Sequence, residues 1–240
     1  MPTDMLADDK PVTINASETD AGAASAKGPL PNPHDLATQL VAKLCHDFIS
    51  PTGAIVSGLD LLADPSAQDM REDAIGLIQS SATKMVALVQ FARVAFGAAT
   101  SAEAFSGREL NKILSDMFVT MRAELRFDIG DEVIFEKPAA RALVNLGYIA
   151  GNALPTGGVA QIGCERTDEA LVLTSVSSGK RARLKPEAVE GLAGKPLSEG
   201  LNGQWIQPFW LHSVVQEAGG TLSVATDTDQ LTLSIRLPQA

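Results

Sequence analysis

Apolar side chains recur at spacings of three, four and seven through the first part of the chain, which is the pattern of a helix with one buried face. The first stripe, in residues 34–62, consists of Leu36, Leu40, Leu44, Phe48, Ile55, Leu59 and Leu62. The second stripe, in residues 67–96, consists of Met70, Ala74, Leu77, Ile78, Ser81, Met85, Leu88, Ala92 and Phe96. The pattern predicts two long amphipathic helices that follow each other closely.

Short breaks bound these two helices. Residues 63–65 end in a proline, Ser66 and Asp69 are expected to cap the second helix, and Gly97 is a natural stop. Two such helices joined by a short turn form an antiparallel hairpin. A lone hairpin leaves part of its stripe in water, at about 25 cal/mol for each Å². Pairing two hairpins into a four-helix bundle removes this exposure, so we expect a homodimer through residues 34–98.

The rest of the chain mixes strand and helix patterns. Strands are expected at residues 124–129, 132–136, 159–164, 170–176, 221–225 and 230–237, and helices at residues 139–153, 186–192 and 205–218. A further helix begins near Leu110, because Ser106 and Glu109 form a capping box before it. Grouped strands with helices on one face indicate an α/β sandwich. The expected fold class is therefore a helical hairpin followed by an α/β sandwich.

Composition divides the chain further. Residues 1–33 contain no aromatic residue and cannot bury enough apolar area to offset their ordering entropy, so we expect a disordered tail. Residues 99–104 are small and polar and are expected to be a linker. The expected domains are the hairpin in residues 34–98 and the α/β domain in residues 105–240.

Charge and cysteine content exclude several function classes. A net charge of -10 argues against nucleic acid and against an anionic membrane surface, since phosphate contacts need clustered Lys and Arg. No apolar run approaches the roughly 20 residues that span a bilayer. The N-terminus lacks the pattern of a secretory signal, and two cysteines without ligand spacing favour reduced thiols. We expect a cytoplasmic protein without a metal site.

The candidate chemistry lies at His46. The residues that share its helix face are mostly small or polar: Gln39, Ala42, Lys43, Ser50, Gly53 and Ser57. The imidazole should therefore point to solvent, where the neutral ring is a competent nucleophile. Asp47 could orient the ring or hold its proton, and Pro51 is expected to bend the helix just beyond it. The bland alternative is an exposed surface histidine beside an unrelated aspartate.

The run His46-Asp47-Phe48-Ile49-Ser50-Pro51 resembles the H-box of histidine kinases, with Ile49 where a polar or basic residue is usual. A longer likeness, strong over residues 35–105 and looser beyond, is to the ChpT family of histidine phosphotransfer proteins. It is carried by residues 44–47, 57–62, 64–66, 70–74 and 90–97. The resemblance implies a dimer in which a kinase-like hairpin bundle carries a phosphohistidine and a degenerate kinase-type ATPase domain follows.

The motifs of ATP binding are mostly missing from the second domain. Asn152 and Ala153 resemble the Asn box, although they also fit an ordinary helix end. The adenine-binding aspartate is absent, because the sequence reads Ser177-Ser178-Gly179 at its expected place. Residues 205–211 contain two tryptophans where a lid would need glycines to cradle phosphates. We therefore expect no bound nucleotide, and we interpret these aromatic residues as core or interface anchors.

The resemblance implies a phosphorelay. A hybrid histidine kinase receiver would pass phosphate to His46, and receivers of the CtrA and CpdR types in a cell-cycle pathway would then take it. Mg²⁺ would come from the partner receiver, and no cofactor would be bound by this chain. The docking surface would include Lys43, His46, Ile49, Ser50 and Gly53. Two alternatives remain open: an ATP-dependent histidine kinase, and a scaffold or kinase inhibitor that is never phosphorylated.

A basic cluster in this acidic chain lies just after the expected strand at residues 170–176. It consists of Lys180, Arg181, Arg183 and Lys185. Such clusters are usually solvated loops, and an acidic partner protein is the alternative interpretation.

Overall fold

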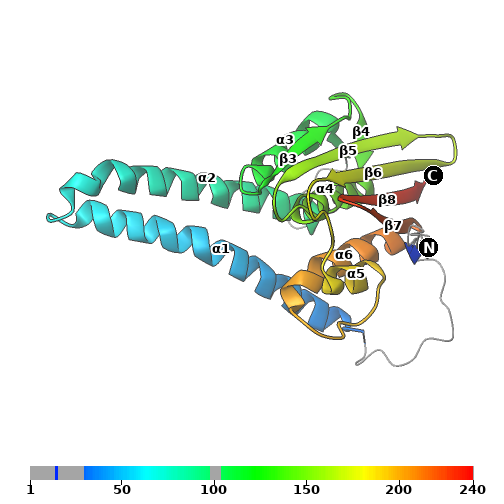
Figure 1. Cartoon of the computed structure of the whole chain (residues 1–240), viewed down its shortest axis with the longest axis horizontal. Helices are drawn as coiled ribbons and strands as arrows, with labels where there is room; N and C mark the ends of the chain where they lie inside the picture. Colours follow the sequence, from blue (N-terminus) through cyan, green and yellow to red (C-terminus); the bar gives the residue numbers. More distant parts are fainter. Residues whose placement is uncertain (1–13, 16–29, 98–103, 240) are drawn as a thin grey trace, which may run out of the picture.

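The computed structural model describes residues 14–15, 30–97 and 104–239. A long helical arm projects from an α/β body (Figure 1). The arm consists of α1 (Pro33–Ala63) and α2 (Arg71–Ala95), with a short 3₁₀ turn, η1 (Gln68–Met70), before the second helix. The predicted hairpin is therefore confirmed. The expected linker lies almost entirely outside the described residues. So does most of the expected tail, of which Ile14–Asn15 (β1) pairs antiparallel with β7 (Thr221–Asp227).

Side-chain caps set the helix ends. At α1 the Asn32 side chain accepts hydrogen bonds from the backbone N–H groups of His34 and Asp35, at 2.9 and 3.0 Å. The predicted Ser66 cap is wrong. The Asp64 carboxylate instead accepts from the Ser66 N–H and hydroxyl at 2.8 and 2.7 Å, and this closes the turn before η1. Gly97 ends α2 with a φ of 68°, a conformation that glycine adopts without strain.

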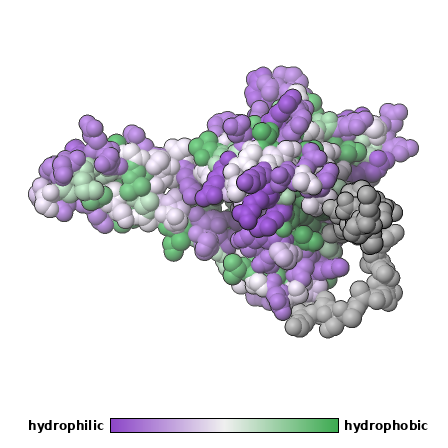
Figure 2. All heavy atoms as spheres, viewed as in Figure 1, coloured by the Kyte–Doolittle hydropathy of each residue, from purple (hydrophilic) through white to green (hydrophobic). Residues whose placement is uncertain are grey.

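The arm has almost no interior of its own. In α1, Pro51 and Gly58 are the two buried residues, and Gly58 lies close to Ala74 and Ile78 of α2. A β-carbon at Gly58 would lie 2.6 Å from Cγ1 of Ile78, so the close approach of the two helices requires glycine. Apolar side chains remain in the open along the arm, where Figure 2 shows them between polar ones.

The body is a mixed sheet in the order β1-β7-β8-β6-β5-β3, in which β3–β5 is the parallel pair. Its main strands are β3 (Ala123–Phe127), β5 (Gly158–Arg166), β6 (Ala170–Ser178), β7, and β8 (Gln230–Pro238). A separate pair joins β2 (Ala104–Ser106) to β4 (Ile134–Glu136). Buried residues alternate along β6 and β8, so one face of the sheet is covered.

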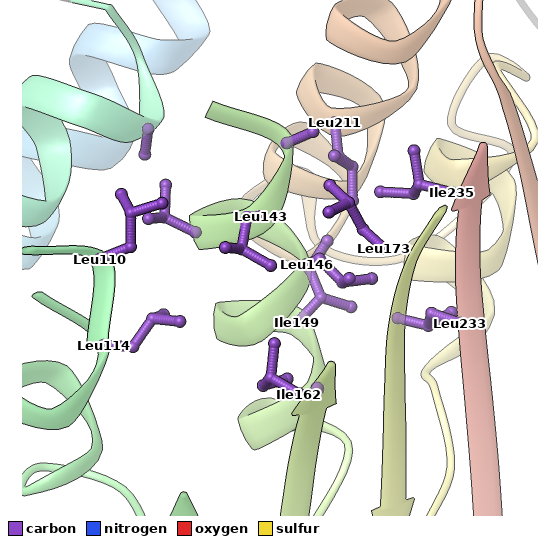
Figure 3. Packing of buried hydrophobic residues seen from close by; sticks show 14 of the residues in the cluster. Leu110, Leu114, Leu143, Leu146, Ile149, Ile162, Leu173, Leu211, Leu233 and Ile235 are labelled. Carbon is purple, nitrogen blue, oxygen red and sulfur yellow. The ribbon is translucent and has the colours of Figure 1, made fainter. Parts of the chain in front are cut away.

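Helices cover that face and complete the predicted α/β sandwich. They are α3 (Gly107–Phe118), α4 (Lys137–Asn152), α5 (Pro186–Leu192) and α6 (Asn202–Glu217). Figure 3 shows Leu143, Leu146 and Ile149 of α4 facing Ile162, Leu173, Leu233 and Ile235 of the sheet. The predicted capping box starts α3, because the Ser106 N–H donates to the Glu109 carboxylate at 2.8 Å and the Glu109 N–H to the Ser106 hydroxyl at 3.3 Å.

A buried polar joint fixes the arm to the body. The carbonyl of Ala95, at the end of α2, accepts from Asn145 Nδ2 at 2.9 Å and from Trp210 Nε1 at 2.7 Å. Gln207 Nε2 donates in turn to Asn145 Oδ1 at 3.2 Å. At the other helix, Leu36 and Leu40 pack on a cluster of Trp205, Ile206 and Phe209. Both helices of the arm are therefore held by α6.

Candidate functional site

His46 lies in the middle of α1 and points into solvent, as the sequence predicts. Its side chain is 88% exposed. Ser50 and Gly53 are also exposed, and a β-carbon at Gly53 would meet nothing within 4 Å. Ile49 is 72% exposed on the adjoining surface. A partner protein can therefore approach the imidazole without displacing any described part of this chain.

Lys43 does not lie on that open surface. Its side chain is 9% exposed, because α4 covers it, and its ammonium lies over the Tyr148 ring at 5.3 Å from the centroid. The expectation that Lys43 faces solvent beside His46 is wrong. Helical spacing places residues three apart near one face, but it cannot show that another domain packs there.

The ammonium of Lys43 binds Asp47 one helical turn later. Lys43 Nζ donates to Asp47 Oδ2 at 2.5 Å, in an (i, i+4) ion pair. Burial by itself lowers the pKa of Lys43, but the Tyr148 side chain and the Asp47 carboxylate outweigh it, so the pKa of Lys43 is raised. The lysine is therefore a firmly charged partner for Asp47.

The second carboxylate oxygen of Asp47 lies beside the histidine. Oδ1 is 3.5 Å from His46 Nδ1, which is a close electrostatic contact and slightly longer than a hydrogen bond. A carboxylate at this position favours the tautomer that carries its proton on Nδ1. The lone pair then lies on Nε2. The arrangement supplies an exposed nucleophilic nitrogen with an acid held next to the opposite ring nitrogen.

A cleft of about 560 Å³ opens between this part of α1 and the body. His46 and Asp47 form one side of it. The remaining sides come from α4, the segment after β6 and the start of α6, with Asn152, Arg183, Lys185 and Gln204 among the lining residues. Arg183 and Lys185 are exposed, so part of the basic cluster noted in the sequence lies at the same cleft as the histidine.

Residues at the expected places of the nucleotide motifs make contacts within the body. Ser177, at the expected place of an adenine-binding aspartate, is fully buried, and its hydroxyl donates to the Ala150 carbonyl at 3.0 Å. In place of a glycine-rich lid the chain forms the continuous helix α6. Trp205 and Phe209 of this helix stack at 4.4 Å between ring centroids and are buried, as expected for core anchors. Asn152 Nδ2 is bound to its own helix, to the Tyr148 carbonyl at 2.8 Å.

Sequence reasoning missed Tyr148 and Gln207. Tyr148 is the single tyrosine of the chain, and its ring packs on Phe91 of α2 at 5.1 Å as well as under Lys43. Gln207 is 1% exposed, lines the cleft and has an Oε1 without a partner among the described residues. Neither residue belongs to a motif, and the contacts of Tyr148 join segments that are distant in sequence, so the pattern held no signal for them.

Two further observations concern the cysteines and the apolar character of the helices. Cys45 and Cys164 are both free, and burial raises the pKa of the Cys164 thiol. Across the described ranges, no helix combines the length and apolar character that crossing a membrane would require.

Comparisons with known proteins agree on one family. Residues 107–230 match the family model described as the histidine phosphotransferase C-terminal domain. The chain is 32% identical over 201 residues to the protein phosphotransferase ChpT of Brucella abortus (strain 2308), which covers 83% of this chain and 94% of that protein. A solved structure described as a bacterial phosphotransferase superposes with a TM-score of 0.75 at 30% identity, covering 85% of this chain and 97% of the other.

Proposed function

The chain belongs to the ChpT family of histidine phosphotransferases, which act in phosphorelays, and from this premise we propose that His46 is its phosphoacceptor. The observation that carries the proposal is the imidazole itself. It is 88% exposed at the middle of α1, among small and polar neighbours, with the Asp47 carboxylate 3.5 Å from Nδ1. The other two histidines lie outside the H-box-like run: His34 is exposed beside Asp35 in the first turn of α1, and His212 is partly buried, with Nδ1 3.0 Å from the Leu192 carbonyl.

The transfer step uses Nε2 of His46 as nucleophile. Nε2 attacks the phosphorus of an aspartyl phosphate on a receiver domain, the N–P bond forms, and the P–O bond breaks. The bonding electrons leave with the receiver carboxylate, and the proton stays on Nδ1. Asp47 then faces the positive charge that develops on the ring, which is electrostatic stabilisation by a group already in place. Mg²⁺ is supplied by the receiver. The reverse reaction delivers the phosphoryl group to a second receiver.

The receiver docks on the open face of α1 and reaches the body across the cleft. Ile49, Ser50 and Gly53 flank His46 and leave room for close approach. Arg183 and Lys185 add positive charge at the far side of the same cleft, where they complement the acidic pocket that holds Mg²⁺ in the receiver. This assigns part of the basic cluster to partner recognition.

The arm dimerises through apolar side chains that are exposed on both of its helices, most of them outside the two stripes of the sequence pattern. Large apolar side chains in the open include Val41 at 58%, Val56 at 51%, Leu59 at 52%, Val86 at 59% and Val89 at 40%. They come from both helices, and such a surface on a monomer is unfavourable in water. Packing two arms into a four-helix bundle buries these side chains and leaves His46 accessible.

The partners are a hybrid histidine kinase receiver as donor and response regulators of the CtrA and CpdR types as acceptors, in a cytoplasmic cell-cycle phosphorelay. This assignment is supported by the likeness to ChpT proteins. The absence of autokinase activity is supported by Ser177, which is buried and bound to the Ala150 carbonyl, and by α6, which replaces a glycine lid. Measurable binding of Mg-ATP to the purified chain would restore the kinase alternative.

The test starts from a purified receiver that carries radiolabelled phosphate. We expect label to move to this chain, to be acid-labile and base-stable, and to disappear in the His46→Ala protein. The circular dichroism and dimer mass of that variant should match the wild type, because the side chain is 88% exposed. Label retained by His46→Ala would overturn the assignment. Receiver control without any labelling of this chain would instead support a scaffold.

A further inference from the structure

Asp47 is held next to His46 by a chain of contacts that begins in the second domain. Tyr148 of α4 lies under the Lys43 ammonium at 5.3 Å from the ring centroid, and Lys43 Nζ binds Asp47 Oδ2 at 2.5 Å. The free oxygen of Asp47 is then 3.5 Å from His46 Nδ1. The chain crosses from the body to the arm and ends at the reacting side chain.

We propose that Lys43 and Tyr148 are positioning residues for phosphotransfer, which fix the Asp47 carboxylate beside Nδ1 of His46. The inference rests on the proposed role of His46. It gives the second domain a direct part in the chemistry, because α4 supplies one end of the chain of contacts. It also reassigns Lys43 from partner contact to support of the site.

Adjacent residues on a helix do not face each other, so the position of Asp47 needs a cause. His46 is 88% exposed and Asp47 only 26%, which shows that the acid leans toward the body while the histidine stands free. The ammonium of Lys43 lies on the body side of Asp47 and takes one of its two oxygens. With Oδ2 fixed there, the planar carboxylate directs Oδ1 toward the imidazole.

Lys43 is itself held at a fixed place. A lysine normally gains from leaving its ammonium in water, yet this side chain is 9% exposed. The Lys43 ammonium lies over the ring of Tyr148, and the same ring also packs on Phe91 of α2, at 5.1 Å between ring centroids and 33° between planes. Tyr148 therefore contacts both helices of the arm, and its contact with Lys43 restricts where the ammonium can lie.

For the reaction, the consequence is that His46 is held in the tautomer with its proton on Nδ1 before the receiver arrives. A carboxylate fixed beside Nδ1 keeps the proton on that nitrogen and the lone pair on Nε2, which faces the incoming phosphorus. If Asp47 swings into solvent, the ring samples both tautomers and loses the facing negative charge. Loss of the partner that orients a metal-ligating histidine typically changes affinity or activity by about 10-fold or more, and we expect an effect of similar size here.

The first experiment measures transfer from a phosphorylated receiver to the full chain, with Lys43→Met and Tyr148→Leu as variants. We expect the rate to fall about 10-fold for Lys43→Met and less for Tyr148→Leu. Tyr148→Phe should lie between Tyr148→Leu and wild type, because it keeps the ring face but loses the hydroxyl that also favours the charged lysine. The matched control is Lys112→Met, which breaks an exposed (i, i+4) Lys–Asp pair on α3 with an Nζ to Oδ2 distance of 2.9 Å. This control should transfer at the wild-type rate.

A spectroscopic readout separates positioning from stability. The ¹⁵N shifts of the imidazole report which nitrogen carries the proton, and the His46 signals are identified by their loss in His46→Ala. We expect the wild type to hold the Nδ1–H tautomer and Lys43→Met to shift toward a mixture. Unchanged shifts in Lys43→Met would overturn the inference even if its transfer slows.

A double-mutant cycle decides whether Lys43 acts through Asp47. In the Asp47→Asn background, we expect Lys43→Met to change the transfer rate by less than about 2-fold, because the interaction is already lost. An undiminished loss in that background would overturn the inference and indicate a role in domain packing alone. Wild-type chain that takes no label at His46 would defeat the proposed function itself, whereas normal labelling with equal rates for Lys43→Met would defeat only the positioning role.

Discussion

The helices of the arm and the helices of the body differ in how many of their residues are buried. In α4 of the body, eleven of sixteen residues are buried, whereas α1 of the arm buries two of thirty-one. The body therefore has a complete core, while the arm shows its apolar side chains to solvent. The difference teaches that the body is stabilised by its own packing, whereas the exposed surface of the arm is free to bind a partner. Under the proposed function, that surface binds a second copy of the chain and, at His46, a receiver.

The largest expected effect comes from the core of the body. Leu146 of α4 is fully buried against the sheet, as Figure 3 shows, so Leu146→Ala should lower the free energy of unfolding by about 2–5 kcal/mol. The control is Val119→Ala, at a position 81% exposed, with an expected change within about 0.5 kcal/mol. Urea unfolding of both variants measures the contrast. Equal losses would mean that the body lacks the close packing described.

The next effect tests whether the arm is completed by a second copy. Val86→Asp places a charge at a site 59% exposed in the single chain and buried in the proposed bundle. We expect its dimer dissociation constant to rise about 100-fold, equivalent to about 2.7 kcal/mol. Sedimentation velocity over a dilution series measures it. Ser80→Asp, at another exposed position of α2, changes the net charge by the same single unit and is the control. A monomeric wild type at all concentrations would refute the dimer.

A smaller effect concerns the contact inside one hairpin. Gly58→Ala would bring the new methyl group to 2.6 Å from Ile78 Cγ1, so we expect a loss of about 1–2 kcal/mol. At Gly76 a β-carbon meets nothing within 4 Å, and Gly76→Ala should stabilise the helix by about 0.5–1 kcal/mol. Thermal unfolding of the pair gives shifts of opposite sign. Two shifts of the same sign would show that the helices are farther apart than described.

The smallest effect lies at the capping box of the body and depends on pH. Hydrogen bonds from the Ser106 backbone N–H and hydroxyl lower the pKa of Glu109. The carboxylate therefore stabilises the fold fully above its unfolded pKa, and this contribution is lost as pH falls through the folded pKa. Glu109→Gln should cost about 0.5 kcal/mol at neutral pH. The difference should vanish in acid, as urea unfolding at both pH values would measure. A difference that persists in acid would contradict the charged cap.

Local patterns predicted much of the fold. The helix Pro186–Leu192 agrees with the predicted range, and the Ser106–Glu109 capping box located α3, because its two residues lie three positions apart in the sequence. The short strand β2 was not predicted, since its pairing with β4 depends on a partner some thirty residues away. The Ser66 cap failed because Asp64, two residues earlier, competes for the same turn.

The site divides in the same way. The exposure of His46 follows from helical periodicity, and the structure agrees. The burial of Lys43 does not follow from it, because the covering residue, Tyr148, comes from another domain. Helical periodicity predicts which residues share a face of the helix. It does not predict which other part of the chain packs against that face.

The joint at Ala95 has a consequence for the direction of phosphate flow. Asn145 and Trp210 both donate to one carbonyl, so the body is fixed at the base of the arm. Under the proposed function, a body held in this position offers the same docking surface to every receiver, whether that receiver brings phosphate or removes it. Donor and acceptor then compete for that surface according to their concentrations and encounter rates. Under the proposed function, mass action among the partners decides which way the relay runs, and the protein itself behaves as a two-way exchange point.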